Sequence, residues 1–117
     1  MLKEKSLKKL RQRLEGERSR LREHIADLND MLRLEDREIG SGEEDADIAA
    51  RAVSYGGLMT LLDSEQETLL EVEGALQAME DGTYGLCTVC GKEIGLARLE
   101  ARPYARRCIT CQERDYR

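Results

Sequence analysis

The sequence predicts a mainly α-helical protein, in which a long antiparallel coiled-coil hairpin is followed by a small four-cysteine module and a short C-terminal helix. Three observations lead to this prediction: apolar residues recur every seven positions in two long series, a Gly-Ser-Gly segment separates the series, and two Cys-x-x-Cys pairs follow them. The 117 residues include no Phe or Trp, and 37% of them are charged, which favours a thin apolar seam over a globular core. We assign the stalk to residues 1–82, with its tip at residues 40–47, and the cysteine module to residues 83–117.

Each apolar series has the spacing of a helix that packs through one face. The expected seam residues are Leu7, Leu14, Leu21 and Leu28 with Leu10, Ile25, Met31 and Leu32 beside them, then Ile48, Tyr55, Leu62, Leu69 and Leu76 with Ala52, Met59, Val72 and Met79 beside them. Pairing the two series in opposite directions, so that position numbers add to 83, places the reversal near 41.5, inside Gly40-Ser41-Gly42. Periodicity and turn chemistry therefore agree on one hairpin. The alternative is a long helix that dimerises through the same seam, and the glycines at the symmetry point argue against it.

The predicted turn is followed by a cluster of carboxylates. Ser41 and Glu44 have the form of a capping box, and Glu43, Asp45 and Asp47 add negative charge to the first turn of the second helix. Such carboxylates stabilise the positive end of a helix by about 0.3–1 kcal/mol each. Capping does not explain why four carboxylates are used. The functional alternative is that a carboxylate cluster at the end of a rod approaches a metal ion or basic residues in a cleft of another molecule. From composition alone, capping is the favoured interpretation.

Four cysteines near the end of the chain have the spacing of a zinc site. Each Cys-x-x-Cys pair directs two thiolates at one ion, and two pairs complete a tetrahedron. Four thiolates leave no open position for water or substrate, so we expect one structural zinc ion rather than a catalytic one. The N-terminus shows no export signal, which favours the reducing cytoplasm, where clustered cysteines bind metal in preference to forming disulfides. The expected ligands are Cys87, Cys90, Cys108 and Cys111, with Gly85 and Gly91 allowing tight turns around the first pair.

The charge distribution excludes several classes of function. Residues 1–22 contain nine basic and three acidic residues, a net charge of +6. Residues 23–81 contain three basic and seventeen acidic residues, a net charge of −14, and residues 82–117 contain seven basic and four acidic residues, a net charge of +3. A general nucleic-acid coat would instead have a basic surface along its length. No apolar run approaches the roughly 20 residues of a membrane span. His24 is the only histidine, and no nucleophile constellation accompanies it, so we do not expect an enzyme.

The cysteine module is basic between its two cysteine pairs. Arginine side chains in an ordinary solvated surface are the common explanation for such a pattern. Contact with a phosphate or with an acidic protein is the functional alternative. The residues concerned are Arg98, Arg102, Arg106 and Arg107.

The cysteine module resembles the zinc finger of the DksA/TraR family. The run from Tyr84 to Gly95 (YGLCTVCGKEIG) and the segment RLEARP at residues 98–103 agree with that finger, as do both cysteine pairs. The resemblance covers residues 7–113 and is strongest from residue 84 onward. In that family a coiled coil precedes the finger and enters the secondary channel of bacterial RNA polymerase. The resemblance therefore implies a transcription regulator that binds RNA polymerase without contacting DNA.

The resemblance also implies a role for the tip. The family motif D-x-x-D-x-A aligns with Glu44, Asp47 and Ala49, so that Glu44 replaces the first Asp with a side chain one methylene longer. Asp45 is a possible substitute for that charge. These four residues would then lie near the catalytic magnesium of the polymerase.

Family members that respond to the alarmone ppGpp have basic residues where the stalk meets the finger. Among the aligned positions, only Arg102 is basic in this sequence. The other positions hold Ser64, Glu67, Glu71 and Gln112. Because acidic residues repel a polyphosphate, we do not expect ppGpp to bind at that junction. The chain ends at Arg117, so the family's C-terminal helix is expected to be short.

Two other classes of function compete with the polymerase regulator. A zinc-stapled coiled-coil adaptor for another protein would use its acidic tip only as a helix cap, and replacing Glu44 and Asp47 by Asn would leave its activity intact. A nucleic-acid binder would use the arginines of residues 98–107 and would show a steep dependence on salt.

Overall fold

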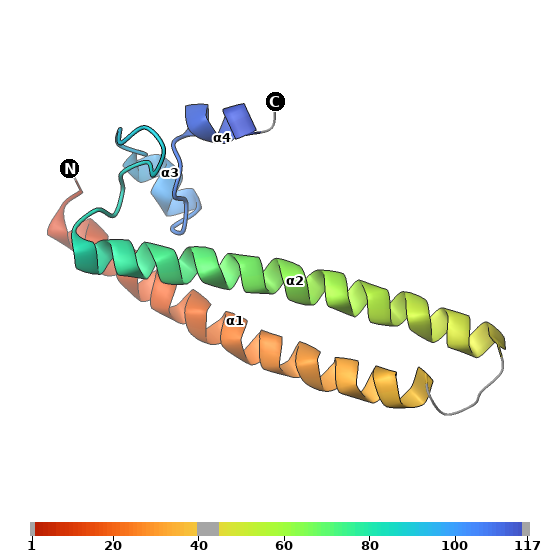
Figure 1. Ribbon diagram of the computed structural model, residues 1–117. Helices are drawn as coiled ribbons and strands as arrows, with labels where there is room; N and C mark the ends of the chain where they lie inside the picture. Colours follow the sequence, from red (N-terminus) through yellow and green to blue (C-terminus); the bar gives the residue numbers. More distant parts are fainter. Residues whose placement is uncertain (1, 40–44, 116–117) are drawn as a thin grey trace. The chain divides into compact units, whose positions relative to one another are not determined.

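The computed structural model describes residues 2–39 and 45–115, and the side chains of residues 2–34 and 53–114. The helices in this part of the chain, shown in Figure 1, are α1 (Glu4–Ile39), α2 (Asp45–Asp81), α3 (Leu96–Ala101) and α4 (Ile109–Asp115). No β-strand occurs within the described ranges, where a single antiparallel bridge joins Leu86 to Glu93. The predicted mainly α-helical fold is confirmed.

The hairpin consists of α1, with 36 residues, and α2, with 37 residues, running in opposite directions (Figure 1). At about 1.5 Å per residue each helix is about 55 Å long. The predicted turn at Gly40-Ser41-Gly42 and the capping box that ends at Glu44 lie outside the described residues. In the described part of the chain, no helix is both long enough and apolar enough to cross a membrane.

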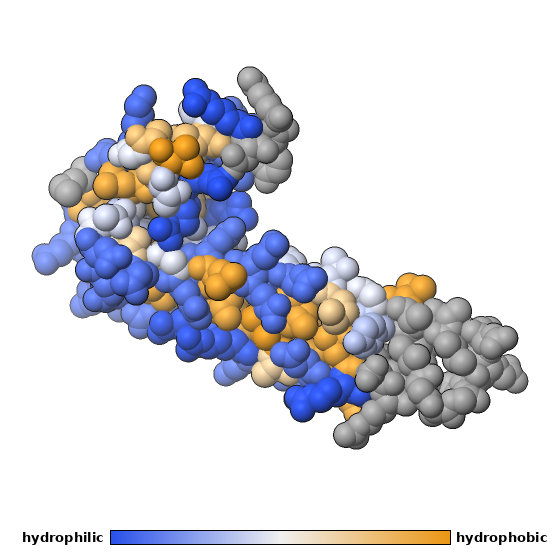
Figure 2. Space-filling view, viewed as in Figure 1, coloured by the Kyte–Doolittle hydropathy of each residue, from blue (hydrophilic) through white to orange (hydrophobic). Residues whose placement is uncertain are grey.

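Residue contacts divide the chain into two compact units. The distal unit is Arg20–Leu69, and the proximal unit combines Met1–Ser19 with Leu70–Arg117. Figure 2 shows hydrophilic side chains over much of the visible surface, with apolar side chains exposed in smaller groups. Each unit has its own apolar cluster.

The distal unit is held by an apolar seam between α1 and α2. Leu28, Leu32 and Leu62 are buried together, each at most 7% exposed, and Ile25, Tyr55 and Leu58 pack against them. His24 belongs to the same interface, where its Nδ1 atom lies 3.5 Å from Oε2 of Glu65.

Two methionines of the distal unit depart from the predicted seam. Met31 is 50% exposed and Met59 is 38% exposed, so neither is buried between the helices. A seven-residue repeat drifts by about 20° per heptad in a straight helix, and residues at the margin of the repeat therefore turn away from the partner helix.

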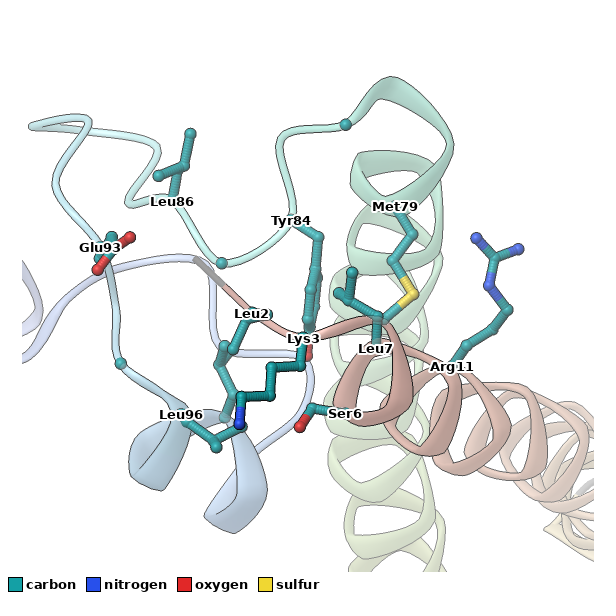
Figure 3. Close-up of a pocket in the computed structure, with 14 residues that line it drawn as sticks. Leu2, Lys3, Ser6, Leu7, Arg11, Met79, Tyr84, Leu86, Glu93 and Leu96 are labelled. Carbon is teal, nitrogen blue, oxygen red and sulfur yellow. The ribbon is translucent and has the colours of Figure 1, made fainter.

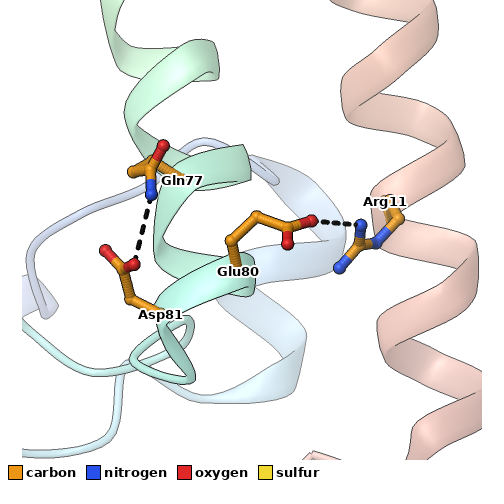
Figure 4. Close-up of polar contacts among 4 residues, drawn as sticks. All are labelled: Arg11, Gln77, Glu80 and Asp81. Atoms are coloured by element: carbon orange, nitrogen blue, oxygen red, sulfur yellow. Dashed lines mark hydrogen bonds and ion pairs between the residues drawn. The ribbon is translucent and has the colours of Figure 1, made fainter.

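Two polar pairs between the helices join residues whose numbers differ from the predicted pairing of the seam, while Leu28 and Tyr55, which that pairing places opposite each other, lie in one apolar cluster. Arg11 pairs with Glu80 at 2.9 Å (Figure 4) and His24 lies beside Glu65, so the position numbers add to 91 and 89 rather than 83. Side chains in a helix lean toward its N-terminus. In an antiparallel hairpin, two side chains that touch therefore belong to residues closer to the C-terminal ends of their helices than two residues whose backbones lie directly opposite each other. The difference concerns which side chains meet, and the antiparallel direction is unchanged.

The proximal unit joins the base of the stalk to the cysteine module through a second apolar cluster. Leu10, Leu99 and Ala105 are buried in it, and Leu2, Met79, Tyr84 and Ile94 pack against them. The cluster therefore combines side chains from both long helices, from α3 and from the loops around the cysteines.

Two hydrogen bonds reinforce this cluster. The Tyr84 hydroxyl donates to the carbonyl of Pro103 at 2.8 Å, and Arg13 on α1 donates to the carbonyl of Glu100 at 2.6 Å. These contacts attach α3 and the following loop to the stalk base.

Candidate metal centre

The four cysteine sulfurs converge on one point. Their Sγ atoms all lie within 4.8 Å of one another, and those of Cys90 and Cys108 are 3.7 Å apart. A tetrahedron of thiolates with Zn–S bonds of about 2.3 Å has S–S edges of about 3.8 Å, so the spacing suits a zinc ion. The cysteines are not disulfide-bonded, because a disulfide needs an S–S distance of about 2.05 Å.

The first cysteine pair is shaped by backbone hydrogen bonds in a tight turn. The Cys87 amide donates to the Lys92 carbonyl at 2.8 Å, and the Gly91 amide donates to the Cys87 carbonyl at 3.0 Å. Gly91 has φ of 76°, in the left-handed region that favours glycine. The turn points the Val89 amide at the Cys87 sulfur, 3.4 Å away.

The second cysteine pair stands at the start of α4. Cys108 precedes the helix, and its carbonyl accepts a hydrogen bond from the Gln112 amide at 3.0 Å. Cys111 follows within the first turn, so both sulfurs reach the same side of the helix start. The Thr88 amide donates to the Arg106 carbonyl at 2.9 Å and so connects the two pairs.

Hydrogen bonds and burial shift the pKa values of three of the four cysteine thiols. Backbone amides of Cys90 and Cys108 lower the pKa of the Cys87 thiol to about 5, and the Cys111 amide lowers the pKa of Cys108. Hydrogen bonding with Cys108 and then burial raise the pKa of Cys111 to about 12. Thiolates are the form of cysteine that binds metal, so metal binding releases the protons that remain on the cluster.

Comparison with known proteins agrees with this geometry. Residues 82–117 match the family model described as the prokaryotic dksA/traR C4-type zinc finger. The chain is also 33% identical, over 109 residues, to the RNA polymerase-binding transcription factor DksA of Escherichia coli, an alignment that covers 93% of this chain and 70% of that protein. The chain belongs to the DksA/TraR family.

Two further relatives of the DksA/TraR family extend the comparison. The solved structure of transcription factor DksA2 from Pseudomonas aeruginosa superposes with a TM-score of 0.78 and 31% identity, covering 97% of this chain and 84% of that one. DksA of Caulobacter vibrioides is 42% identical over 78 residues, which are 64% of this chain and 55% of that protein. The chain thus spans about half the length of that relative.

The cysteine cluster is therefore a DksA/TraR zinc finger that holds one structural zinc ion. The predicted ligands Cys87, Cys90, Cys108 and Cys111 are the four residues that the fold brings together. Cys87 and Cys111 are buried, at 3% and 4% exposure, which shields their bonds to the metal from water.

The acidic tip lies mostly beyond what the structure describes. Glu44 is outside the described residues. Asp45 is the first residue of α2, and Asp47 and Ala49 belong to the helical backbone that follows, without described side chains. The roles that the family resemblance implies for these four residues stay predictions.

The predicted arginines of the finger have contacts within the protein. Arg98 donates to the Arg107 carbonyl at 3.1 Å, and the Arg102 guanidinium lies 5.1 Å from the centre of the Tyr104 ring. These contacts brace the loop between α3 and the second cysteine pair. Their use as rim or phosphate contacts remains a prediction.

Arg106 shows a contact that the sequence analysis missed. One of its guanidinium nitrogens lies so close to Gly74 that a Cβ on this residue would require a shift. Gly74 lies inside α2, where a glycine costs about 1 kcal/mol of helix stability relative to alanine. A glycine at such a position in the sequence can indicate that another group lies close to the helix there. The glycine leaves room for the end of the Arg106 side chain against α2.

Proposed function

We propose that this protein is a transcription regulator that binds bacterial RNA polymerase through its secondary channel, without contacting DNA. The observation that carries this proposal is the 33% identity to E. coli DksA, an RNA polymerase-binding transcription factor, over 93% of the chain. The alignment extends through both arms of the hairpin as well as the finger, which supports a shared mode of binding. A cytoplasmic location follows from this partner.

The two ends of the hairpin would have different tasks in such a complex. The finger and stalk base, with their excess of basic residues, would bind the outside of the channel. The tip residues Glu44, Asp45, Asp47 and Ala49 would reach the polymerase active site, where carboxylates near the catalytic magnesium would change the stability of the open promoter complex. The zinc ion would hold the finger together and take no part in chemistry, because four thiolates fill its coordination sphere.

We further propose that the protein acts without ppGpp at the junction of stalk and finger. Glu67 and Glu71, at positions where responsive relatives carry basic residues, are exposed on α2. Their negative charges would oppose binding of a polyphosphate.

The test compares the zinc-loaded protein with its Glu44→Asn/Asp47→Asn variant for affinity to core RNA polymerase and for effect on transcription in vitro. The matched control is Glu23→Gln/Asp27→Asn, which removes the same charge from exposed positions on α1. We expect all three proteins to bind with similar affinity and only the tip variant to lose its effect on transcription.

Each departure from this result has a distinct meaning. Absence of binding at micromolar polymerase would refute the proposal and favour the adaptor. Full activity of the tip variant would refute the role of the tip while leaving polymerase binding in place. Equal loss of activity in the control variant would show that overall charge, rather than the tip, matters.

A further inference from the structure

The proximal unit contains a cavity of about 570 Å³ that is separate from the zinc ligands. Residues from the start of α1, the end of α2, the loop before Cys87 and the start of α3 surround it (Figure 3). Its volume falls within the range of about 300–1,000 Å³ that is typical of sites for small molecules. The proposed contact with RNA polymerase gives this cavity no role.

The walls of the cavity are mainly apolar. Leu99 forms part of the wall and is fully buried, whereas Leu96 and Leu86 are 38% and 41% exposed. Leu7 and Met79 add apolar surface from the two long helices (Figure 3). A hydrocarbon group in the cavity would remove the exposed part of this lining from water, which is the main source of affinity for an apolar ligand.

The charge of the lining is positive, and one cation is available. The charged lining residues are Lys3, Arg11 and Glu93, with a net charge of +1. Arg11 is paired with Glu80, and Glu93 has a polar partner of its own. Lys3 is exposed, and within the described residues its ammonium group has no carboxylate partner.

Lys3 is placed to pair with a ligand at the cavity. Its side chain lies along the cavity wall between Ser6 and Leu96 in Figure 3. Ser6 contributes a hydroxyl group to the same lining. An ammonium group and a hydroxyl beside an apolar cavity suit a ligand with one carboxylate and one hydrocarbon part.

We propose that this cavity binds a small amphipathic carboxylic acid, with its hydrocarbon part against Leu7 and Leu96 and its carboxylate beside Lys3 and Ser6. The ligand would fasten the N-terminal turn of α1 to the finger, because the cavity is lined from both. The proposal does not depend on polymerase binding and can be tested on the isolated protein.

The test is isothermal titration of the full zinc-loaded chain with octanoate. The probes 1-octanol and octyltrimethylammonium have the same hydrocarbon chain with a neutral and a positive head group. We expect octanoate to bind more tightly than either. Lys3→Gln should weaken octanoate binding by about two- to fivefold, as for a partly exposed ion pair, and leave octanol binding unchanged. The matched control is Lys8→Gln, an exposed lysine of α1 outside the cavity.

A second variant and a second measurement locate the binding site. Ser6→Phe places a large side chain in the cavity and should abolish binding of both octanoate and octanol, with unchanged helix content and zinc stoichiometry. In the wild-type protein, octanoate should shift the NMR methyl signals of Leu7 and Leu96. The methyl signals of Leu28 in the distal unit should not move.

Three results would overturn the proposal. One is the absence of octanoate binding up to millimolar concentration, and another is equal affinity for the cationic probe. The third is methyl shifts that appear only when polymerase is added, which would assign the cavity to a side chain of a protein partner instead.

Discussion

Leu99 provides the most direct test of how the finger depends on the stalk. It is fully buried, and it packs with Leu10 of α1 and with Met79 and Tyr84. Leu99→Ala removes a buried isobutyl group, and such changes cost about 2.7–5 kcal/mol, depending on how much space is left empty. Because Leu99 also lines the cavity of the proximal unit, neighbouring side chains have room to relax into the space, and the cost should be near the lower end, about 3 kcal/mol.

The assay is zinc affinity, measured by competition with a chromophoric chelator. In small zinc modules the free energy of metal binding is coupled to folding, so packing lost from the folded finger weakens the apparent affinity for zinc. A loss of about 3 kcal/mol corresponds to roughly 100-fold weaker binding. The matched control is Leu86→Ala, a truncation of the same kind at a side chain that is 41% exposed, and we expect less than about a threefold change there.

Wild-type zinc affinity in Leu99→Ala would refute this reasoning. The finger would then fold around its metal without help from the stalk, and the apolar cluster would only position it. Equal weakening by Leu86→Ala would also contradict the argument, since burial would not be what determines the cost.

Two further predictions concern the finger. The Tyr84 pKa is raised from 10.0 to about 12, mainly by burial, so the neutral phenol is favoured in the folded state. The contribution of the neutral phenol to the stability of the fold should be complete below pH 10 and lost as the pH rises toward 12. Ultraviolet titration should show one tyrosine ionising late, and Tyr84→Phe should abolish that late step and cost about 0.5–1.5 kcal/mol at neutral pH through the lost hydrogen bond to Pro103. Removal of zinc by a chelator, or Cys90→Ser, should unfold the finger while the circular dichroism of the long helices largely persists, because the distal seam contains no metal ligand. Cooperative loss of all helical signal on chelation would contradict this prediction.

The sequence by itself determined the elements and the metal. The seven-residue repeats indicate two long helices because helical periodicity is a local property of the chain, and the spacing of the cysteine pairs indicates zinc because each pair forms a ligand turn on its own. The resemblance in residues 84–103 also identified the family, since those residues shape the finger locally. In each case the sequence pattern and the structure that it predicts involve residues that are close together in the sequence.

Only the tertiary structure decided which surfaces meet. The exposure of Met31 and Met59 and the pairing of Arg11 with Glu80 depend on helix twist and side-chain direction across the hairpin. The contact between Arg106 and Gly74 joins residues 32 positions apart, and no local pattern records such a meeting. The cavity beside Lys3 likewise forms where four separate segments converge, because shape and unpaired charge arise from packing and not from the order of residues along the chain.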